Sequence, residues 1–293
     1  MRRFLVLLAL TVVTSDLLAH PGAAIAVTAD GRVHVVDTGG GVFSIERNGR
    51  AVRREGPAFH WFALDPQGRF RNTAWPSLPG AEFRSAGVNP TLILSSDYPV
   101  VIGSDGIFYY PQGSQRQGVR IVGITPAGAQ SMRATLPPMQ SGGKSAWWLN
   151  GLAAGPDRSL YYTEDRAVRR IDARGKVSAV AATVVIPNCT AIPGIGPELR
   201  PYLRGLAVAP DGTVYVAASG CGAVLRIEPG GKTTTILRTE APWSPTAVAI
   251  ANGELYVLEY LHTASDNRRE WLPRVRRISR TGAVVTLWSS DRR

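Results

Sequence analysis

The chain has 293 residues with 44% hydrophobic residues, 19% charged residues and a formal net charge of +11. Glycine and proline are abundant, with 31 and 21 residues, and they recur at turn-like intervals. We find no linker rich in proline or serine and no long helical pattern, so the composition argues against two domains and favours one all-β domain.

The first nineteen residues are expected to be a signal peptide. Arg2 and Arg3 precede an apolar run at residues 4–13 that is too short to span a bilayer. Cleavage after Ala19 leaves residues 20–293 as one domain; cleavage after Ala23 or Ala24, or an uncleaved anchor, remains an alternative. No other run has transmembrane length, so we expect a secreted or periplasmic protein, and a monomer.

The two cysteines, Cys189 and Cys221, are expected to form a disulfide in an exported chain. The bond would close a loop of about thirty residues and would contribute roughly 3–4 kcal/mol to stability. Two free thiols are the alternative.

Arginine carries most of the positive charge, because only Lys144, Lys176 and Lys232 are lysines. A cluster of arginines lies near the C-terminus: Arg268, Arg269, Arg274, Arg276, Arg277, Arg280, Arg292 and Arg293. We interpret the cluster as a solvated basic edge, with attraction to an anionic surface or acidic ligand as the alternative. Nucleic acid is not expected as a partner, because the chain is exported and aromatic residues are not interleaved with the arginines.

The segment 205–237 contains four short apolar runs joined by turns, which predicts one four-stranded antiparallel sheet. Similar segments recur around six turns centred at residues 30, 67, 105, 157, 211 and 252. Asp-Gly and Asn-Gly pairs between apolar runs favour tight hairpins, because both residues tolerate a positive φ. The copy around residue 67 is the weakest, with only a doubtful third strand near residues 82–86.

Six such units fill residues 20–293, which predicts a six-bladed β-propeller of four-stranded antiparallel blades. An open β-sandwich is the alternative, and it explains the repeat less well.

The segments 151–180 and 205–237 resemble NHL repeats. The second reads Gly-Leu-Ala-Val, Pro-Asp-Gly, Val-Tyr-Val, Val-Leu-Arg-Ile and Gly-Gly-Lys, a pattern typical of that repeat. The wider group includes the regucalcin- and gluconolactonase-like six-bladed propellers. The resemblance specifies the fold better than the activity, because one fold carries unrelated functions.

The longer connections of the chain, residues 136–149, 183–203 and 261–273, are all expected on the face opposite the Asp-Gly turns. We call it the loop-rich face, and loops on a rigid scaffold commonly carry function. The disulfide would hold the second of these connections over the channel mouth. Hairpin register places a set of polar residues at the mouth of the central channel on this face: Asp37, His60, Tyr98, Asn150, Glu164, Arg204 and Glu259.

Asn150, followed by Gly-Leu-Ala, resembles the metal-binding asparagine of gluconolactonase-like lactonases. In that family two Asn, one Glu and one Asp hold Ca²⁺ or Zn²⁺, so the resemblance implies a divalent cation at Asn150. Arg204 stands where the family has an Asp, and the Glu55-Gly56-Pro57 echo of its Glu-Gly-Pro entry lies five residues early, so most of the ligand set is unsupported. The alternative role of Asn150 is to bond backbone groups.

Aromatic residues also lie in or beside the long connections: Trp147, Trp148, Tyr202, Trp243 and Trp271. They would either stack on a ligand or cover the blades. His60 is the candidate general base or ligand, His34 is expected to be packed or exposed without a role, and His262 is expected to lie in a long loop. We therefore expect an exported propeller that binds a small molecule or a protein at its loop-rich face. A metal-dependent hydrolase of the lactonase type, using Asn150 with His60, Glu164 or Glu259, is the alternative.

Overall fold

The computed structural model describes residues 21–37, 41–54, 59–75, 81–85, 90–114, 116–263 and 270–290, with residues 81–85 described as backbone only. The expected signal peptide and the Glu55-Gly56-Pro57 motif therefore lie outside the described residues. Within these ranges no helix is long and apolar enough to cross a membrane.

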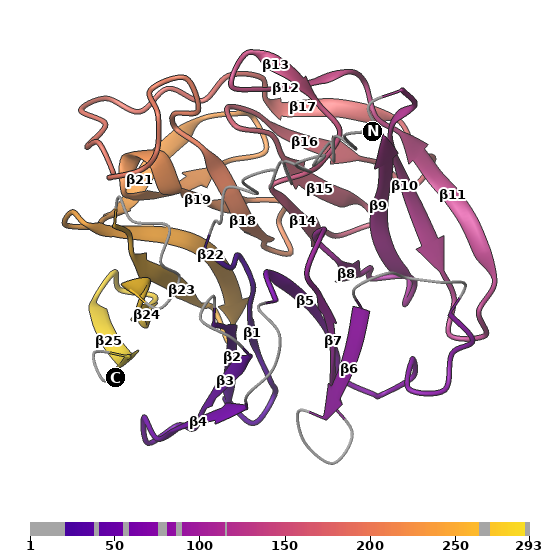
Figure 1. Ribbon diagram of the computed structural model, residues 1–293, viewed down its shortest axis with the longest axis horizontal. Coiled ribbons are helices and arrows are strands. Elements are labelled where there is room, and N and C mark those ends of the chain that lie inside the picture. The colour runs from indigo at the N-terminus through magenta and orange to yellow at the C-terminus, as the bar shows by residue number, and fades with distance from the viewer. Residues whose placement is uncertain are drawn as a thin grey trace, which may run out of the picture.

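The described chain is an all-β propeller whose sheets are arranged in a ring (Figure 1). Five sheets are four-stranded and antiparallel, with their strands in sequence order. They are β1 (Ile25–Val27), β2 (Val33–Val36), β3 (Val42–Ile45) and β4 (Ala51–Arg54); β8 (Val101–Ile102), β9 (Phe108–Ser114), β10 (Gly118–Ile124) and β11 (Gln130–Thr135); β14 (Gly151–Ala154), β15 (Leu160–Thr163), β16 (Val168–Ile171) and β17 (Val177–Ala181); β18 (Leu203–Val208), β19 (Val214–Ala218), β20 (Ala223–Ile227) and β21 (Thr233–Arg238); and β22 (Trp243–Ala251), β23 (Glu254–Leu261), β24 (Pro273–Ile278) and β25 (Val284–Ser289).

The hairpins turn where the Asp-Gly pairs predicted them. Gly106 and Gly212 have φ values of +76° and +83°, in the left-handed region that glycine adopts without strain. Asp211 closes its turn by accepting the backbone N–H of Thr213 at 2.9 Å. These local bonds explain why the turn positions were readable from the sequence.

The second unit does not form the four-stranded sheet that was expected. Its described part is a three-stranded sheet of β5 (Trp61–Asp65), β6 (Ala81–Ser85) and β7 (Thr91–Ser95), in the order β5-β7-β6. The prediction of a strand directly after residue 68 is wrong. The Asp65 carboxylate accepts the N–H of Phe70 at 2.9 Å, and the chain continues there as turns. Of the six four-stranded sheets that were expected, five are therefore present among the described residues.

A central cavity of about 310 Å³ runs between the innermost strands of the five blades and of the three-stranded sheet. Its walls are the first strand of each sheet, β1, β5, β8, β14, β18 and β22, with mainly Ala, Val, Leu and Ile side chains. The apolar residues of the other strands pack between neighbouring sheets. Each sheet thus buries both faces only by stacking against its neighbours.

In the described part of the fold, no strand is shared between the first and last sheets, and side chains join the two. The Tyr260 hydroxyl of β23 donates to the Val36 carbonyl of β2 at 2.6 Å. Phe43 of β3 contacts Trp288 of β25 with 4.5 Å between ring centroids. Residues 21–24 are buried along this seam, and a Cβ on Gly22 would lie 2.2 Å from Cγ2 of Val36, so only glycine fits there.

Candidate functional site

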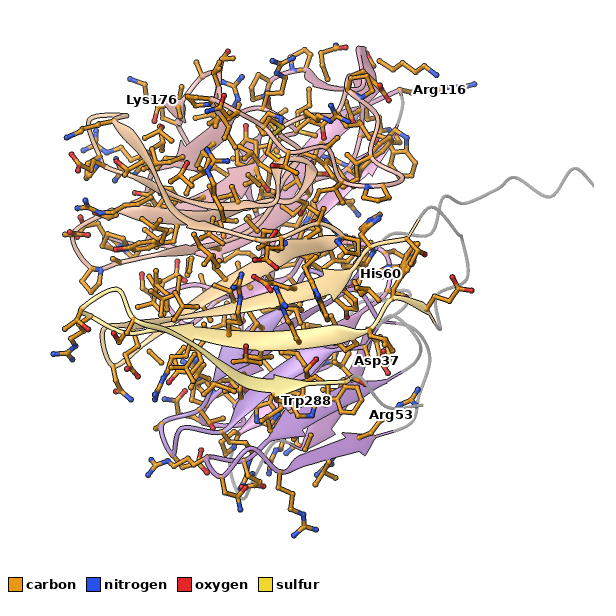
Figure 2. The ribbon with its side chains drawn as sticks, turned by 90° about the vertical axis from the view of Figure 1, so that its left-hand side faces the viewer. Asp37, Arg53, His60, Arg116, Lys176 and Trp288 are labelled. Atoms are coloured by element: carbon orange, nitrogen blue, oxygen red, sulfur yellow. A yellow bond between two sulfur atoms is a disulfide. The ribbon has the colours of Figure 1, made fainter. Side chains whose placement is uncertain are left out.

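The loop-rich face carries the extra structure of this propeller. Residues 136–149 add a two-stranded hairpin, β12 (Met139–Ser141) and β13 (Lys144–Ala146), outside the ring sheets. Figure 2 shows Arg116, His60 and Asp37 toward this side and Lys176, which follows a turn at the other ends of the strands, toward the opposite side. The two ends of the propeller are therefore built differently.

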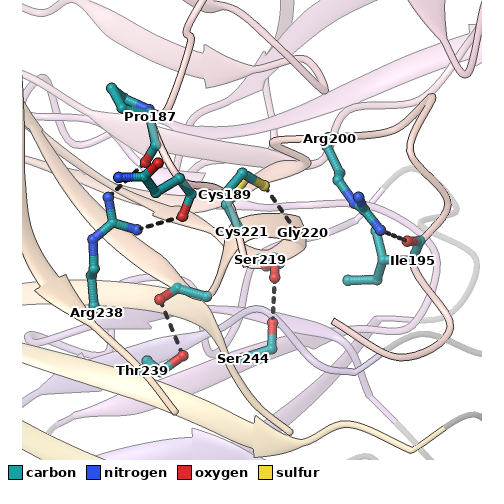
Figure 3. Close-up of a disulfide and its surroundings, with 12 residues drawn as sticks. Pro187, Cys189, Ile195, Arg200, Ser219, Gly220, Cys221, Arg238, Thr239 and Ser244 are labelled. Atoms are coloured by element: carbon teal, nitrogen blue, oxygen red, sulfur yellow. Dashed lines mark hydrogen bonds between the residues drawn. A yellow bond between two sulfur atoms is a disulfide. The ribbon is translucent and has the colours of Figure 1, made fainter. Parts of the chain in front are cut away.

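The disulfide between Cys189 and Cys221 is present, as predicted, with 4.6 Å between the Cα atoms (Figure 3). It ties the connection 183–203 to the short 3₁₀ helix η1 (Ser219–Cys221) that follows β19. Arg238 of β21 donates to the Pro187 carbonyl at 2.8 Å, and the N–H of Gly220 donates to the Pro201 carbonyl at 2.9 Å. The connection 183–203 is thus fixed to the sheet of β18–β21 at several points.

His60 directly precedes β5 and its imidazole is oriented by a backbone group. Its Nδ1 lies 2.7 Å from the Ser96 carbonyl oxygen, and because a carbonyl only accepts, Nδ1 carries the proton. The neutral ring then has its lone pair on Nε2, which is the acceptor that a general base or ligand uses. Sequence reasoning could not find this partner, because Ser96 follows β7, the strand whose place in the sheet was not predicted.

Tyr98 is half-buried beside Tyr110, with 5.8 Å between the ring centroids. Burial is the main reason why the pKa of Tyr98 is raised to about 12, so its hydroxyl stays protonated at neutral pH. Tyr98 therefore keeps the O–H that makes it a hydrogen-bond donor.

Asn150 is buried directly before β14, and its amide nitrogen is fully engaged. It donates to Oδ1 of Asp165 at 2.8 Å and to the Leu203 carbonyl at 3.0 Å. Asp165, which was not singled out from the sequence, also accepts the N–H of Gly142 at 3.1 Å and so connects the β12–β13 hairpin to the channel mouth. The contacts of Asn150 are those of a residue that bonds neighbouring groups of the fold.

Arg204 of β18 is only 2% exposed at the channel mouth. Its guanidinium donates to the Pro21 carbonyl at 2.5 Å and lies 5.7 Å from the centroid of the Tyr202 ring. Burial lowers the pKa of Arg204. Tyr202 itself has a φ of +52°, a strained value for a tyrosine.

His262 lies near Arg204, although the sequence predicted only that it belongs to a long loop. It is buried at the end of β23, and its ring stacks on Trp271 with 5.4 Å between centroids. Burial, and then the charge of Arg204, lower the pKa of His262, so the ring is neutral at physiological pH. A long connection gives no periodic signal, so only the folded chain brings His262 toward Arg204.

Each of the three carboxylates predicted at the mouth forms an ion pair with arginine. Asp37 pairs with Arg53 at 3.2 Å, and Glu164 pairs with Arg169 at 2.6 Å. Glu259 is completely buried and is held by Arg274 and Arg276. These oxygens are therefore already neutralised by cations, which opposes a role in binding a metal.

The metal site that the resemblance implied does not form as a cluster. Among the described residues no group of three His, Cys, Asp or Glu side chains is placed to hold an ion. Asn150 points its amide nitrogen to Asp165, and Arg204 stands beside it in the ring. The cation at Asn150 therefore remains a prediction that the neighbouring residues do not support.

The aromatic residues of the loop-rich face fall into two groups. Trp271 is buried under His262, and Trp243 lies against the guanidinium of Arg274, 4.0 Å from the ring centroid. Trp147 and Trp148 remain exposed beside the β12–β13 hairpin. The first group covers the ends of the strands, and only the second faces solvent.

No protein-family model matches this sequence, and no curated protein matches it. Solved structures do match. A catalytically inactive His-to-Ala variant of virginiamycin B lyase from Staphylococcus aureus with quinupristin gives a TM-score of 0.53 at 16% identity, covering 92% of this chain and 85% of that chain. A streptogramin B lyase structure gives 0.52 at 16%, covering 92% and 84%.

A gluconolactonase from Xanthomonas campestris gives a TM-score of 0.40 at 15% identity, covering 80% of this chain and 67% of that chain. The likeness to the two lyase structures is one of fold, and it agrees with the β-propeller expected from the sequence.

Proposed function

We propose that this protein binds a small molecule in its central channel. The molecule enters, or is held, at the loop-rich face. One observation supports the proposal: polar side chains lie at or just before the starts of strands that line a central cavity, and the side chains of these strands are mainly aliphatic. His60, Asn150 and Arg204 directly precede or begin wall strands, and Tyr98 lies just before another. Concave apolar sites with a few placed polar groups are the usual form of small-molecule sites.

The mouth residues favour a ligand with an apolar body and an anionic or hydrogen-bond-accepting head. Arg204 contributes a positive charge, Tyr98 contributes a protonated hydroxyl, and Nδ1 of His60 is bonded to the Ser96 carbonyl. The ion-paired carboxylates add no unpaired negative charge that would repel such a head. We also infer that the three-stranded sheet is the sixth blade, because its β5 forms one wall of the same cavity.

A second candidate is catalysis at the same mouth with His60 as the proton acceptor. The observation that favours it is the 2.7 Å contact that fixes the His60 tautomer, because a general base needs such an orienting partner. The lactonase-type metal mechanism is less well supported, since Glu164 and Glu259 are paired with arginines.

The test uses the dye 8-anilinonaphthalene-1-sulfonate, which has an apolar body and an anionic head. We expect its fluorescence to rise on titration with the protein. In Ala154→Leu, which adds a larger side chain at a partly exposed position of the channel lining, the affinity should fall roughly tenfold, and Tyr98→Phe should weaken it by a few-fold through one lost donor.

The matched control is Ala173→Leu, the same substitution in an exposed turn on the outside of the molecule, which should bind the dye like the original protein. Equal affinity in the Ala154→Leu and Ala173→Leu variants would show that the channel is not the site.

A further inference from the structure

Two neighbouring indoles are exposed on the loop-rich face. Trp147 is 42% exposed and Trp148 is 45% exposed, and their rings meet edge to face with 5.7 Å between centroids and 86° between planes. The other large hydrophobic side chains exposed in the described part of the chain are aliphatic. Trp147 and Trp148 are therefore the aromatic surface that this part of the molecule offers to a partner.

The fold holds these indoles outward on a fixed base. They follow β13, which pairs with β12 from Met139 opposite Ala146 to Ser141 opposite Lys144. Met139 and Leu149, on either side of the pair in sequence, are 3% and 1% exposed in the core. A Cβ on Gly113 would lie only 2.6 Å from the Trp147 carbonyl oxygen, so β9 packs directly against this backbone. Burial of the flanking residues leaves the two rings at the surface.

Two exposed cations lie on the same side of the molecule as the pair. Lys144 is exposed on β13, and Arg116 is exposed after β9 on the same side of the molecule (Figure 2). Three acidic groups of the described chain lie next to the hairpin. Glu164 and Asp165 lie beside the hairpin and Trp148, with Glu164 paired to Arg169 and Asp165 buried, and the Cγ of Glu198 would lie 3.7 Å from a Cβ on Gly142. With a net charge of +11 over the whole chain, the surface is complementary to an anionic partner.

We propose that Trp147 and Trp148, with Lys144 and Arg116, dock the protein on an anionic lipid surface. Indole rings partition into the membrane–water interface, and adjacent lysine and arginine side chains bind anionic headgroups. The 86° angle between the two rings gives no common plane on which a sugar ring would stack on both, whereas an interface accepts rings in any orientation. The proposal is independent of the ligand proposed for the channel.

The experiment compares vesicles of phosphatidylcholine alone with vesicles of phosphatidylcholine and phosphatidylglycerol. The purified protein with its disulfide intact should sediment with the anionic vesicles, with its tryptophan emission shifted to the blue, and binding should weaken as salt is raised. Binding to the neutral vesicles should be at least roughly tenfold weaker.

The Trp147→Ala/Trp148→Ala variant should lose the blue shift and at least about tenfold in affinity, and Lys144→Gln/Arg116→Gln should lose the salt-sensitive part. Met132→Ala is the matched control, because it removes a 64% exposed apolar side chain from the blade edge and should leave binding unchanged. Unchanged far-ultraviolet circular dichroism and melting temperature show that each variant is folded.

Failure to bind anionic vesicles, or equal binding by the double tryptophan variant, overturns the proposal. Binding to polygalacturonate that requires both tryptophans, without binding to vesicles, would assign the surface to a glycan and would overturn it as well.

Discussion

Glu259 is fully buried, and Arg274 and Arg276 both hold its carboxylate. A buried carboxylate is strongly destabilising unless it is paired and hydrogen-bonded, so these two arginines serve the fold. Arg277 also pairs with Glu254 at 3.6 Å, and Arg280 donates to the Asn252 carbonyl at 2.6 Å. Arg274 and Arg276 therefore belong to the interior of the last sheet, while Arg277 and Arg280 remain on its exposed edge.

His34 makes a residue-scale prediction about pH. It is buried in β2 with Nδ1 at 2.9 Å from Oγ of Ser44, and burial lowers its pKa from 6.5 to about 4. As the pH falls below 6.5 the unfolded chain takes up this proton first, so stability is lost between about pH 6.5 and pH 4. The free energy of unfolding should fall by about 2 kcal/mol at pH 5 on account of this residue.

Urea unfolding near pH 7.5 and pH 5 measures this loss in the original protein and in His34→Asn, whose amide can still bond Ser44. The variant should lose about 2 kcal/mol less on acidification. Equal losses in both proteins would contradict the assignment.

At the scale of elements, the connection 183–203 is bonded to the sheet of β18–β21. The Ile192 and Ile195 side chains of this connection are buried, and Arg200 donates to the Ile195 carbonyl at 3.3 Å (Figure 3). Because this connection leads directly into β18, it also positions Arg204 at the channel mouth. The disulfide therefore supports the candidate site as well as the sheet.

Removing the disulfide in Cys189→Ala/Cys221→Ala should lower the free energy of unfolding by about 3–4 kcal/mol, because the bond closes a loop with a sequence separation of 32 residues. The midpoint of guanidinium unfolding measures the change. A reductant should lower the midpoint of the original protein and leave that of the variant unchanged. If the midpoints of the oxidised protein and the variant coincide, the connection is held by its other contacts alone.

At the scale of the whole molecule, side chains rather than a shared strand join the first and last sheets. The Tyr260 hydroxyl bonds Val36, Phe43 meets Trp288, and Arg204 reaches Pro21. These contacts join a larger apolar core that the first and last sheets share, and the seam lies beside the channel mouth that we propose as the ligand site.

A double-mutant cycle on Phe43→Leu and Trp288→Leu tests the seam. Urea unfolding of the single and double variants should give a coupling energy of about 0.5–1.5 kcal/mol, as for other aromatic pairs. A second cycle that combines Phe43→Leu with Trp147→Ala, two residues without a contact, should give no coupling. Absence of coupling between Phe43 and Trp288 would mean that this ring contact does not contribute to closure.

The sequence by itself determined the features that depend on local chemistry. The Asp-Gly turns, the alternating apolar strands between them and the pairing of Cys189 with Cys221 follow from residues close in sequence or from a pair with no other partner. Only the tertiary structure decided the second sheet, because the Asp65 carboxylate and the burial of Phe70 override its weak turn signal.

The candidate site was decided in the same way. The sequence register brought His60, Tyr98, Asn150 and Arg204 to the starts of wall strands, because strand period and turn position fix where each strand begins. The roles of their neighbours depend on contacts across sheets: Ser96 orienting His60, Asp165 bonding Asn150, and His262 meeting Arg204 from a long connection. Such contacts join residues tens of positions apart, and no local pattern encodes them.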